Sequence, residues 1–295
     1  MADLSTEFLT TRELAELLRI KERKVYDLAA SGEVPCSRAT GKLLFPRREI
    51  DSWLASHSSG GATARLNRQS KVIVGSQDPL LEWSLRASGA ELATLFDGSL
   101  DGLDRFEKGE GQASALHLYD PDSDDWNVAV VEERFRHAPV ALVEFAWRER
   151  GLVIAPGDHD SINEVGDLRG RRLAPRQEAA GSQILLRSLM LQADVDEAQV
   201  EWAETARTES DAALAVLEGQ ADAALGLRAM AQRLRLSFVP IVRERFDLLV
   251  DRAAWFDPPL QKLLRFCYSS AFRKKAAELG GYDVSGLGTV HFNGG

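Results

Sequence analysis

Short apolar runs alternate with helical patterns from residue 72 to residue 279, and this alternation restricts the possible folds more than any other feature. The runs that predict strands are residues 72–74, 92–96, 113–118, 140–146, 152–154, 172–174, 200–202, 221–227 and 238–250. Helical stretches separate most of them, and helices at about 258–266 and 270–279 close the chain. Such alternation is typical of parallel sheets covered by helices on both faces. Because the alternation occurs twice, with strand segments crossing between the two sets, we expect an α/β body of two lobes around a cleft.

Residues 8–54 carry a different pattern, that of a compact helix-turn-helix with a wing. Thr10 or Thr11 can cap a first helix. The other predicted elements are a turn at 19–21, a helix over 22–30 that Gly32 ends, two short strands within 37–45 and a last helix opened by Pro46. The side chains expected to face inward are Leu14, Leu17, Leu18, Ile20, Val25, Leu28, Ile50, Trp53 and Leu54.

Charge separates this N-terminal module from the body. The whole chain has 36 Lys+Arg and 45 Asp+Glu, a net charge of -9. Residues 19–48 hold eight basic and three acidic side chains, a local net of +5. Lys and Arg that neutralise phosphates supply most of the affinity of a small DNA-binding module. With +2 on residues 1–68, residues 69–295 carry -11, so we expect the body to have a partner other than DNA.

The domain boundary is expected at residues 55–70, where Ser58-Ser59-Gly60-Gly61 is small and flexible. The predicted domains are a DNA-binding domain at 1–57, a linker at 58–70 and a ligand-binding domain at 71–295. Within the last, lobe I is expected at about 71–150 plus 245–295, and lobe II at about 151–244.

Several classes of protein are disfavoured. Two cysteines far apart, Cys36 and Cys267, cannot form a disulfide framework. No apolar run approaches the roughly 18 residues of a membrane span, and the N-terminus lacks the pattern of a signal peptide, so we expect a cytoplasmic protein that does not bind membranes. Catalytic fingerprints and metal-ligand spacings are also lacking, including in the aspartate-rich stretch 120–125. We therefore expect neither an enzyme, a cofactor nor a bound cation.

Residues 8–54 resemble the excisionase-like, MerR-type winged helix-turn-helix family. The resemblance rests on LTTRELAELL, RIKERKVYDLAASGEVP and GKLLFPRREIDSWL. It implies double-stranded DNA as a partner, with the second helix in the major groove. The residues it places at DNA are Arg23, Lys24 and Tyr26 on that helix, Arg38 and Lys42 on the wing, and Arg47 and Arg48 at the last helix. For each arginine alone, a solvated surface position is the competing interpretation, and a basic protein-binding module is the competing reading of the whole.

Residues 70–295 resemble the molybdate-type substrate-binding domain of the periplasmic-binding-protein fold (type II). The matching stretches are VIVGSQDPLLEWSL, ASALHLYDPDSDDWN, RGLVIAPGD, LRGRRLAPRQEAAGSQILLRSLM, GQADAALGLRAMA, FVPIVRERFDLLV and GGYDVSGLGTVHF. Together the two resemblances imply a one-component transcriptional regulator, in which a transport-type binding domain senses a cytoplasmic ligand. A homodimer is the expected form.

The candidate ligand contacts follow predicted strands, where a cleft of this kind opens. They are Ser76, Gln77, His117, Arg176, Gln177, Gly181, Ser182 and Gln183. Loops that enter helices present N–H groups and a positive dipole end, which favour anions. Competing interpretations are helix capping by Ser76 or Asp78, an ion pair of Arg176 with Glu178, and a purely structural His117.

Molybdate or tungstate is the predicted effector, since a fully deprotonated oxyanion suits a ring of donors and the resemblance points the same way. Another small anion or an organic acid is the first alternative. A hydrolase that uses Ser182 with His117, and a purely architectural DNA-binding protein, are two others.

Overall fold

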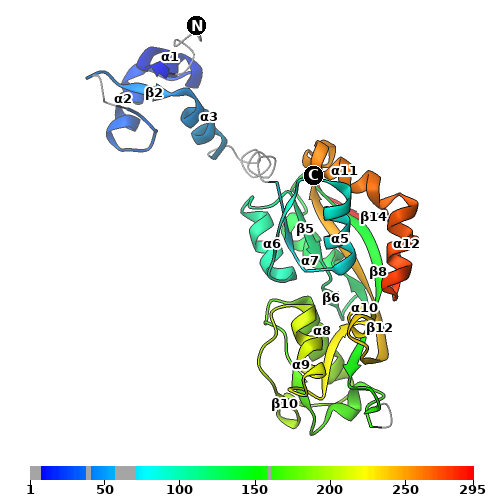
Figure 1. Ribbon diagram of the computed structural model, residues 1–295. Coiled ribbons are helices and arrows are strands. Elements are labelled where there is room, and N and C mark those ends of the chain that lie inside the picture. Colours follow the sequence, from blue (N-terminus) through cyan, green and yellow to red (C-terminus); the bar gives the residue numbers. More distant parts are fainter. Residues whose placement is uncertain (1–7, 38–40, 57–70, 159–160) are drawn as a thin grey trace. The chain divides into compact units, whose positions relative to one another are not determined.

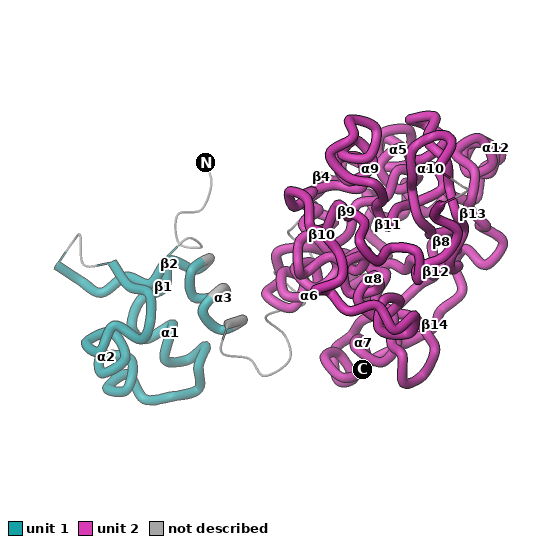
Figure 2. Tube along the Cα trace, turned by 90° about the horizontal axis from the view of Figure 1, so that it is seen from below, with its two compact units in different colours: residues 1–65 teal, residues 66–295 magenta. Residues whose placement is uncertain are grey.

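The computed structural model describes residues 8–37, 41–56, 71–158 and 161–295, and for residues 48, 51, 52, 55 and 56 it describes the backbone alone. The chain divides into two compact units, Met1–Arg65 and Leu66–Gly295 (Figure 2). Each unit is considered by itself.

Unit 1 is a small helical module closed by a two-stranded sheet. Its elements are β1 (Phe8–Thr10), α1 (Thr11–Leu18), α2 (Glu22–Ala30), β2 (Leu44–Pro46) and α3 (Arg47–Ser56). Thr10 caps α1 through a capping box with Glu13, as its position predicts. After α2, Gly32 takes a φ of 73°, a left-handed conformation that glycine adopts without strain and that turns the chain away from the helix axis. The helices therefore begin and end where local chemistry dictates.

The wing of unit 1 differs in part from the sequence prediction. Of the two strands expected within residues 37–45, the structure keeps a bridge in which Ser37 and Leu44 exchange backbone hydrogen bonds of 2.7 and 3.0 Å. β2 instead pairs along its length with β1, a strand that the sequence analysis did not predict. Leu17, expected inside, is 39% exposed, because the core lies on the Leu14 side of α1. Pro46 ends β2, and α3 begins one residue later than predicted.

The core of unit 1 is formed by buried side chains from all three helices and both strands. They are Leu9, Leu14, Ala15, Val25, Ala29, Val34, Phe45 and Ile50. This packing places the remaining face of α2 on the surface.

Unit 2 is built on one mixed sheet with the strand order β10-β9-β11-β8-β12-β5-β3-β4, to which β13 and β14 add by pairing with β8. Its strands are β3 (Val72–Gly75), β4 (Ala93–Phe96), β5 (Ala113–Leu116), β8 (Val140–Ile154), β9 (Arg172–Ala174), β10 (Glu201–Trp202), β11 (Ala223–Leu227), β12 (Ser237–Asp251), β13 (Tyr282–Asp283) and β14 (Val290–Asn293). A separate hairpin joins β6 (Tyr119–Asp120) to β7 (Asp125–Trp126). The α-helices are α5 (Pro79–Ser88), α6 (Ser99–Glu107), α7 (Val128–Phe135), α8 (Gly181–Gln192), α9 (Glu209–Leu217), α10 (Arg228–Leu234), α11 (Pro258–Cys267) and α12 (Ser270–Leu279). Short 3-10 turns lie at Val165–Leu168, Glu197–Gln199 and Ala254–Phe256.

Two long antiparallel strands, β8 and β12, join the two lobes (Figure 1). Lobe I gathers β3, β4 and β5 with α5, α6, α7, α11 and α12, and lobe II gathers β9, β10 and β11 with α8, α9 and α10 (Figure 1). The expectation of parallel sheets is confirmed for the three short strands of each lobe, which pair in parallel, whereas β8 and β12 run antiparallel to their neighbours. Residues 140–146 and 152–154, expected as separate segments, belong to the single strand β8.

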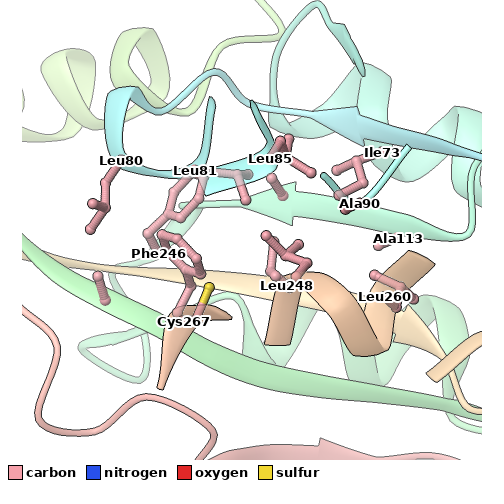
Figure 3. Packing of buried hydrophobic residues seen from close by; sticks show 14 of the residues in the cluster. Ile73, Leu80, Leu81, Leu85, Ala90, Ala113, Phe246, Leu248, Leu260 and Cys267 are labelled. Carbon is pink, nitrogen blue, oxygen red and sulfur yellow. The ribbon is translucent and has the colours of Figure 1, made fainter. Parts of the chain in front are cut away.

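Each lobe has its own apolar core. In lobe I, side chains of α5 and α11 pack on one face of the sheet around Phe246 and Leu248 of β12 (Figure 3), and Phe272 and Ala276 of α12 belong to the same core. In lobe II, Leu185, Leu186 and Met190 of α8 pack on strands β9 and β11. Within the described residues, every helix is too short or too polar to span a bilayer.

Candidate functional site

A small pocket lies where the two lobes meet. Ser76, Gln77, Phe96, Gly98 and His117 line it from lobe I, and Arg176, Ala180, Ser182 and Glu209 line it from lobe II. The volume of this cavity is about 10 Å³, roughly enough for one ordered water. The two lobes therefore lie close together here and leave a small space between them.

The lining residues reach the pocket from the carboxyl ends of short parallel strands. Ser76 and Gln77 follow β3, Gly98 follows β4, and His117 follows β5. Arg176 follows β9 in the other lobe. The carboxyl ends of strands form the usual ligand crevice of open α/β sheets, so the topology itself brings these positions together.

Two helices begin at the pocket without a side-chain cap. The N-cap of α6 is Gly98 and that of α8 is Ala180, and neither residue makes a side-chain cap hydrogen bond; in the first turn of α6, the Leu100 N–H donates to the Ala179 carbonyl. The start of a helix carries partial positive charge and N–H donors, which favour an anion. Ser182, in the first turn of α8, is 2% exposed, and its hydroxyl has no hydrogen-bond partner among the described residues.

The lobes touch each other beside the pocket. The Leu100 N–H donates to the Ala179 carbonyl at 3.2 Å, and the Gln177 amide donates to the Asp97 carbonyl at 3.3 Å. A Cβ on Gly181 would lie 2.5 Å from the His117 carbonyl oxygen. Glycine at 181 therefore allows an approach of the two backbones that any side chain would prevent.

A chain of buried ion pairs runs from lobe I through the long strands to lobe II. Its N···O distances are Asp78–Arg148 2.9 Å, Arg148–Glu244 2.5 Å, Glu244–Arg150 2.8 Å, Arg150–Glu209 3.2 Å and Glu209–Arg176 3.0 Å. We call these six residues the hinge network. All six are at most 9% exposed, and three positive charges balance three negative ones. Buried charges need such pairing, because burial of an unpaired ion is costly.

The ionisation states in the network follow from this pairing. Burial alone would raise the pKa of Glu244, but Arg148 and Arg150 outweigh it and hold that pKa well below its usual range. Arg150 and Arg176 lower the pKa of Glu209 against the same opposing effect of burial. Burial also lowers the pKa of His117, and the attraction of Glu244 does not offset it. His117 is therefore neutral at pH 7 and donates from Nδ1 to Glu244 at 3.0 Å.

Six of the eight predicted ligand residues lie at the pocket or directly beside it. The other two form hydrogen bonds with backbone groups near the pocket. Ser76, Gln77, His117, Arg176 and Ser182 line the pocket, and Gly181 abuts it. Gln177 bridges the lobes, and the Gln183 side-chain oxygen accepts the Arg176 backbone N–H at 2.8 Å.

Of the competing structural interpretations, helix capping by Asp78 is confirmed, whereas the ion pair of Arg176 with Glu178 was wrong. Asp78, not Ser76, caps α5, and the Ser76 hydroxyl instead bonds that of Ser99 at 2.7 Å. Glu178 pairs with Arg187 and not with Arg176. The Arg176 guanidinium donates to Glu209 and to the carbonyls of Ala206 and Arg207, so it is held by lobe II itself.

Several residues of this site were not predicted from the sequence. Ser99 follows a short strand as Ser76 does, so the same rule could have found it. Glu209 looks like an ordinary acidic residue in the first turn of a helix. No local pattern distinguishes Arg148, Arg150 and Glu244, which lie in stretches interpreted as strand or as a connection.

Among the described residues, no group of three or more His, Cys, Asp and Glu side chains is placed to hold a metal ion. The hydrolase alternative needs a hydrogen bond from Ser182 to a base. In the structure the Ser182 hydroxyl has no partner in the described part of the chain, and His117 Nδ1 bonds Glu244.

In unit 1, the second helix presents the side chains predicted to meet DNA. Arg23, Lys24 and Tyr26 are exposed on α2, and Tyr26 is 52% exposed although it is aromatic. Lys42 is exposed and Arg47 is half-buried. Arg38 and the side chain of Arg48 lie outside the described residues.

Comparison with known families identifies both units. Residues 82–268 match the model of the PBP superfamily domain, and residues 8–58 match a helix-turn-helix domain. The chain belongs to the PBP superfamily domain family. The fold class is that expected from the sequence, an α/β periplasmic-binding-protein-like body with an N-terminal helix-turn-helix. The helix-turn-helix domain indicates DNA binding and the PBP-like domain indicates ligand binding; these are binding modules and not enzyme families.

Proteins similar to the chain include two curated relatives and two solved structures. The uncharacterized protein YvgK of Bacillus subtilis is 23% identical over 97% of this chain and 98% of its own length. An uncharacterized protein encoded in the 5' region of a ferredoxin 2Fe-2S gene of Clostridium pasteurianum is 30% identical over 76 residues, 25% of this chain and 67% of that protein. A Clostridium perfringens structure named as a phosphate ABC transporter substrate-binding protein, with bound phosphate, has a TM-score of 0.53 at 10% identity, covering 74% of this chain and 98% of that one. The sulfate-binding protein SubI of Mycobacterium tuberculosis has a TM-score of 0.51 at 13% identity, covering 72% and 86%. At these identities the structures establish the shared fold.

Proposed function

We propose that this protein is a ligand-responsive transcriptional regulator, which binds DNA through unit 1 and a small oxyanion in the pocket of unit 2. The observation that carries the proposal is the convergence of the N-termini of α6 and α8, which lack a side-chain cap, from opposite lobes on a pocket with the Ser182 hydroxyl, which has no partner among the described residues. A tetrahedral oxyanion can accept hydrogen bonds from both helices at once. The known binders of phosphate and sulfate with this fold support the class of ligand.

The effector is proposed at the level of the class, small oxyanions with four oxygens. Molybdate and tungstate, predicted from the resemblance, belong to this class. Another small anion or an organic acid is the alternative at the same site. The binding of each of these anions can be measured separately. A small pocket between two lobes should discriminate among the anions by size and by hydrogen bonding.

The proposed DNA contacts are the exposed basic side chains of α2 and the wing. Arg23 and Lys24 form no ion pair with any described residue, so their charges are available to phosphates. As the resemblance implies, the proposed basic surface also includes Arg38, Lys42, Arg47 and Arg48. Tyr26 adds an aromatic side chain to this surface.

The proposed coupling is a change in lobe closure. An anion that bonds both lobes stabilises the closed state by its differential affinity for that state. In a homodimer, closure would alter the spacing of two DNA-binding units, and the spacing of half-sites on DNA is geometrically strict.

The proposal is tested by ligand-induced stabilisation and DNA binding of the full chain. We expect one or more oxyanions at about 100 times the dissociation constant to add roughly 2.7 kcal/mol to the stability of unit 2. Ser182→Ala should weaken that binding, whereas Ser188→Ala on the same helix, whose hydroxyl accepts a hydrogen bond from Gln192, should not. Arg23→Ala with Lys24→Ala should weaken DNA binding and leave anion affinity unchanged. If no anion stabilises the protein, the sensor function is wrong, and an architectural role for the body is favoured.

A further inference from the structure

The pocket offers hydrogen-bond acceptors as well as donors. Gln77 donates its amide Nε2 to Glu82 at 3.0 Å. Since a carboxylate only accepts hydrogen bonds, this bond fixes the orientation of the amide and leaves Oε1 as its other end. That oxygen is buried and has no partner among the described residues. Gln77 therefore presents an acceptor at the pocket.

His117 presents a second acceptor for a similar reason. Both Glu244 oxygens lie at arginines, and Oε2 also faces His117 Nδ1. Because the ionised Glu244 cannot donate, the proton of this hydrogen bond belongs to Nδ1. In the neutral ring, Nε2 then carries a lone pair, and His117 lines the pocket at 3% exposure.

Glu209 is the third acceptor, and it carries charge. It lines the pocket at 4% exposure. Among the described residues, its Oε1 accepts from Arg150 and Arg176, whereas its Oε2 accepts from Arg150 alone, at 3.2 Å. A carboxylate has about four acceptor positions, so Oε2 can accept a further hydrogen bond from a bound ligand.

An anion without protons fits this set poorly. Sulfate and molybdate are fully deprotonated at neutral pH and only accept hydrogen bonds, so they would match the helix N-termini and Ser182 but place oxygen lone pairs against those of Glu209, His117 and Gln77. The hinge network adds no net positive charge to offset the repulsion, since its three arginines are balanced by three carboxylates. An oxyanion that keeps an O–H group can donate to these acceptors and still accept from the donors.

We propose that the pocket selects an oxyanion that carries a proton, of which hydrogen phosphate is the simplest, over fully deprotonated oxyanions of similar shape. This inference rests on the proposed function, because it assumes that an anion occupies the pocket. Glu209 is its main specificity-determining residue. Sites that bond a ligand O–H reject analogues without it by factors of up to about 10⁴ or 10⁵, so we expect discrimination of at least about 100-fold here.

The test is calorimetric titration of the full chain with five anions at pH 7 and constant ionic strength. Phosphate and arsenate, which retain protons at this pH, should bind at least about 100-fold more tightly than sulfate, molybdate and tungstate. This inference is wrong if sulfate, molybdate or tungstate binds as tightly as phosphate. That result would still agree with the proposed oxyanion sensor. Binding of none of the five would overturn both.

Two variants separate specificity from structure. Glu209→Gln replaces the charged acceptor by an amide and should reduce the ratio of phosphate to sulfate affinity at least about 10-fold. The control is Glu218→Gln, at the exposed end of the same helix, which should leave this ratio unchanged. Because Glu209 also holds Arg150 and Arg176, Gln77→Met provides a second reading: it removes a neutral acceptor outside the hinge network and should lower the same ratio. If both variants keep the ratio of the unaltered protein, the inference is wrong.

Discussion

Replacing Arg150 with Met removes the central cation of the hinge network but keeps an unbranched side chain of similar length. The Arg150 guanidinium lies 2.8 Å from Glu244 and 3.2 Å from Glu209, and the side chain is fully buried. Its loss leaves Glu244 with Arg148 and Glu209 with Arg176. Removing one partner from a buried ion pair typically costs about 3–5 kcal/mol. We expect the free energy of unfolding of unit 2 to fall by about that amount.

The matched control is Arg243→Met on β12. The Arg243 side chain is 59% exposed and pairs with Asp283 at 3.0 Å, and such exposed pairs contribute about 0–1 kcal/mol. Urea unfolding followed by tryptophan fluorescence measures both variants, because Trp53 is the single tryptophan of residues 1–65 and the remaining five of six report on unit 2. An Arg150→Met loss no larger than that of Arg243→Met would refute the role of the network.

The pH dependence of the Arg150→Met effect gives an independent check. The arginines lower the folded-state pKa of Glu209 and Glu244. In the unaltered protein, these carboxylates therefore add stability above their unfolded pKa of about 4.3, and that stability is lost as pH falls through their folded-state values. Arg150→Met raises both folded-state pKa values. The stability difference between variant and unaltered protein should be largest at neutral pH and narrow below about pH 4.3; a difference independent of pH would contradict the electrostatic explanation.

Three further predictions follow from other contacts. Gly181→Ala places a methyl group 2.5 Å from the His117 carbonyl oxygen, so calorimetry should show that this variant binds the anion more weakly than the unaltered protein. The control is Gly166→Ala, in which the nearest atoms to the new methyl group belong to side chains. Equal affinities of the two variants would contradict the close approach at Gly181. Burial raises the pKa of Cys267 to about 12, so its alkylation by iodoacetamide at pH 8 should be more than about 100-fold slower than in urea, and similar rates would contradict its burial. Thr10→Ala removes the capping box of α1 and should destabilise unit 1 by about 1 kcal/mol in thermal unfolding; an unchanged transition would show that the cap contributes nothing.

Local signals explain why the helix-turn-helix was predicted closely. The capping box of Thr10, the turn at Arg19 and the left-handed Gly32 act within a few residues of the boundaries they set. The range predicted for α2, 22–30, is that of the structure. β1 was missed because three residues are too few to show a period, and only its partner β2, far along the chain, stabilises it.

Distant contacts explain what the sequence could not reveal. The hinge network interrupts the apolar pattern of β8 with Arg148 and Arg150, so one long strand looked like two segments with a polar connection. The partners of these arginines are Asp78 and Glu209, 70 and 59 residues away. A charged residue in a buried strand is stabilised by partners that only the fold brings near, and one sequence carries no sign of which acid will be there.

The candidate pocket residues show the same division. Ser76, His117 and Ser182 follow strands or begin helices, which is a position visible in sequence. Whether each is a donor, an acceptor or already occupied depends on neighbours from elsewhere in the chain: His117 is oriented by Glu244, 127 residues away. The expectation of a ring of donors followed from residue types alone, and the acceptor role of Glu209 emerged only with its placement at the pocket.

The central claim, that an anion in the pocket changes DNA binding, is tested most directly by fluorescence anisotropy of a labelled duplex that the full chain selects from a random library. The dissociation constant for DNA is measured with and without saturating phosphate at constant ionic strength, because DNA affinity depends strongly on salt. We expect phosphate to change this dissociation constant at least about 5-fold, with the change retained in Ser188→Ala and much reduced in Ser182→Ala. An identical dissociation constant with and without phosphate, while calorimetry shows the anion bound, would contradict it.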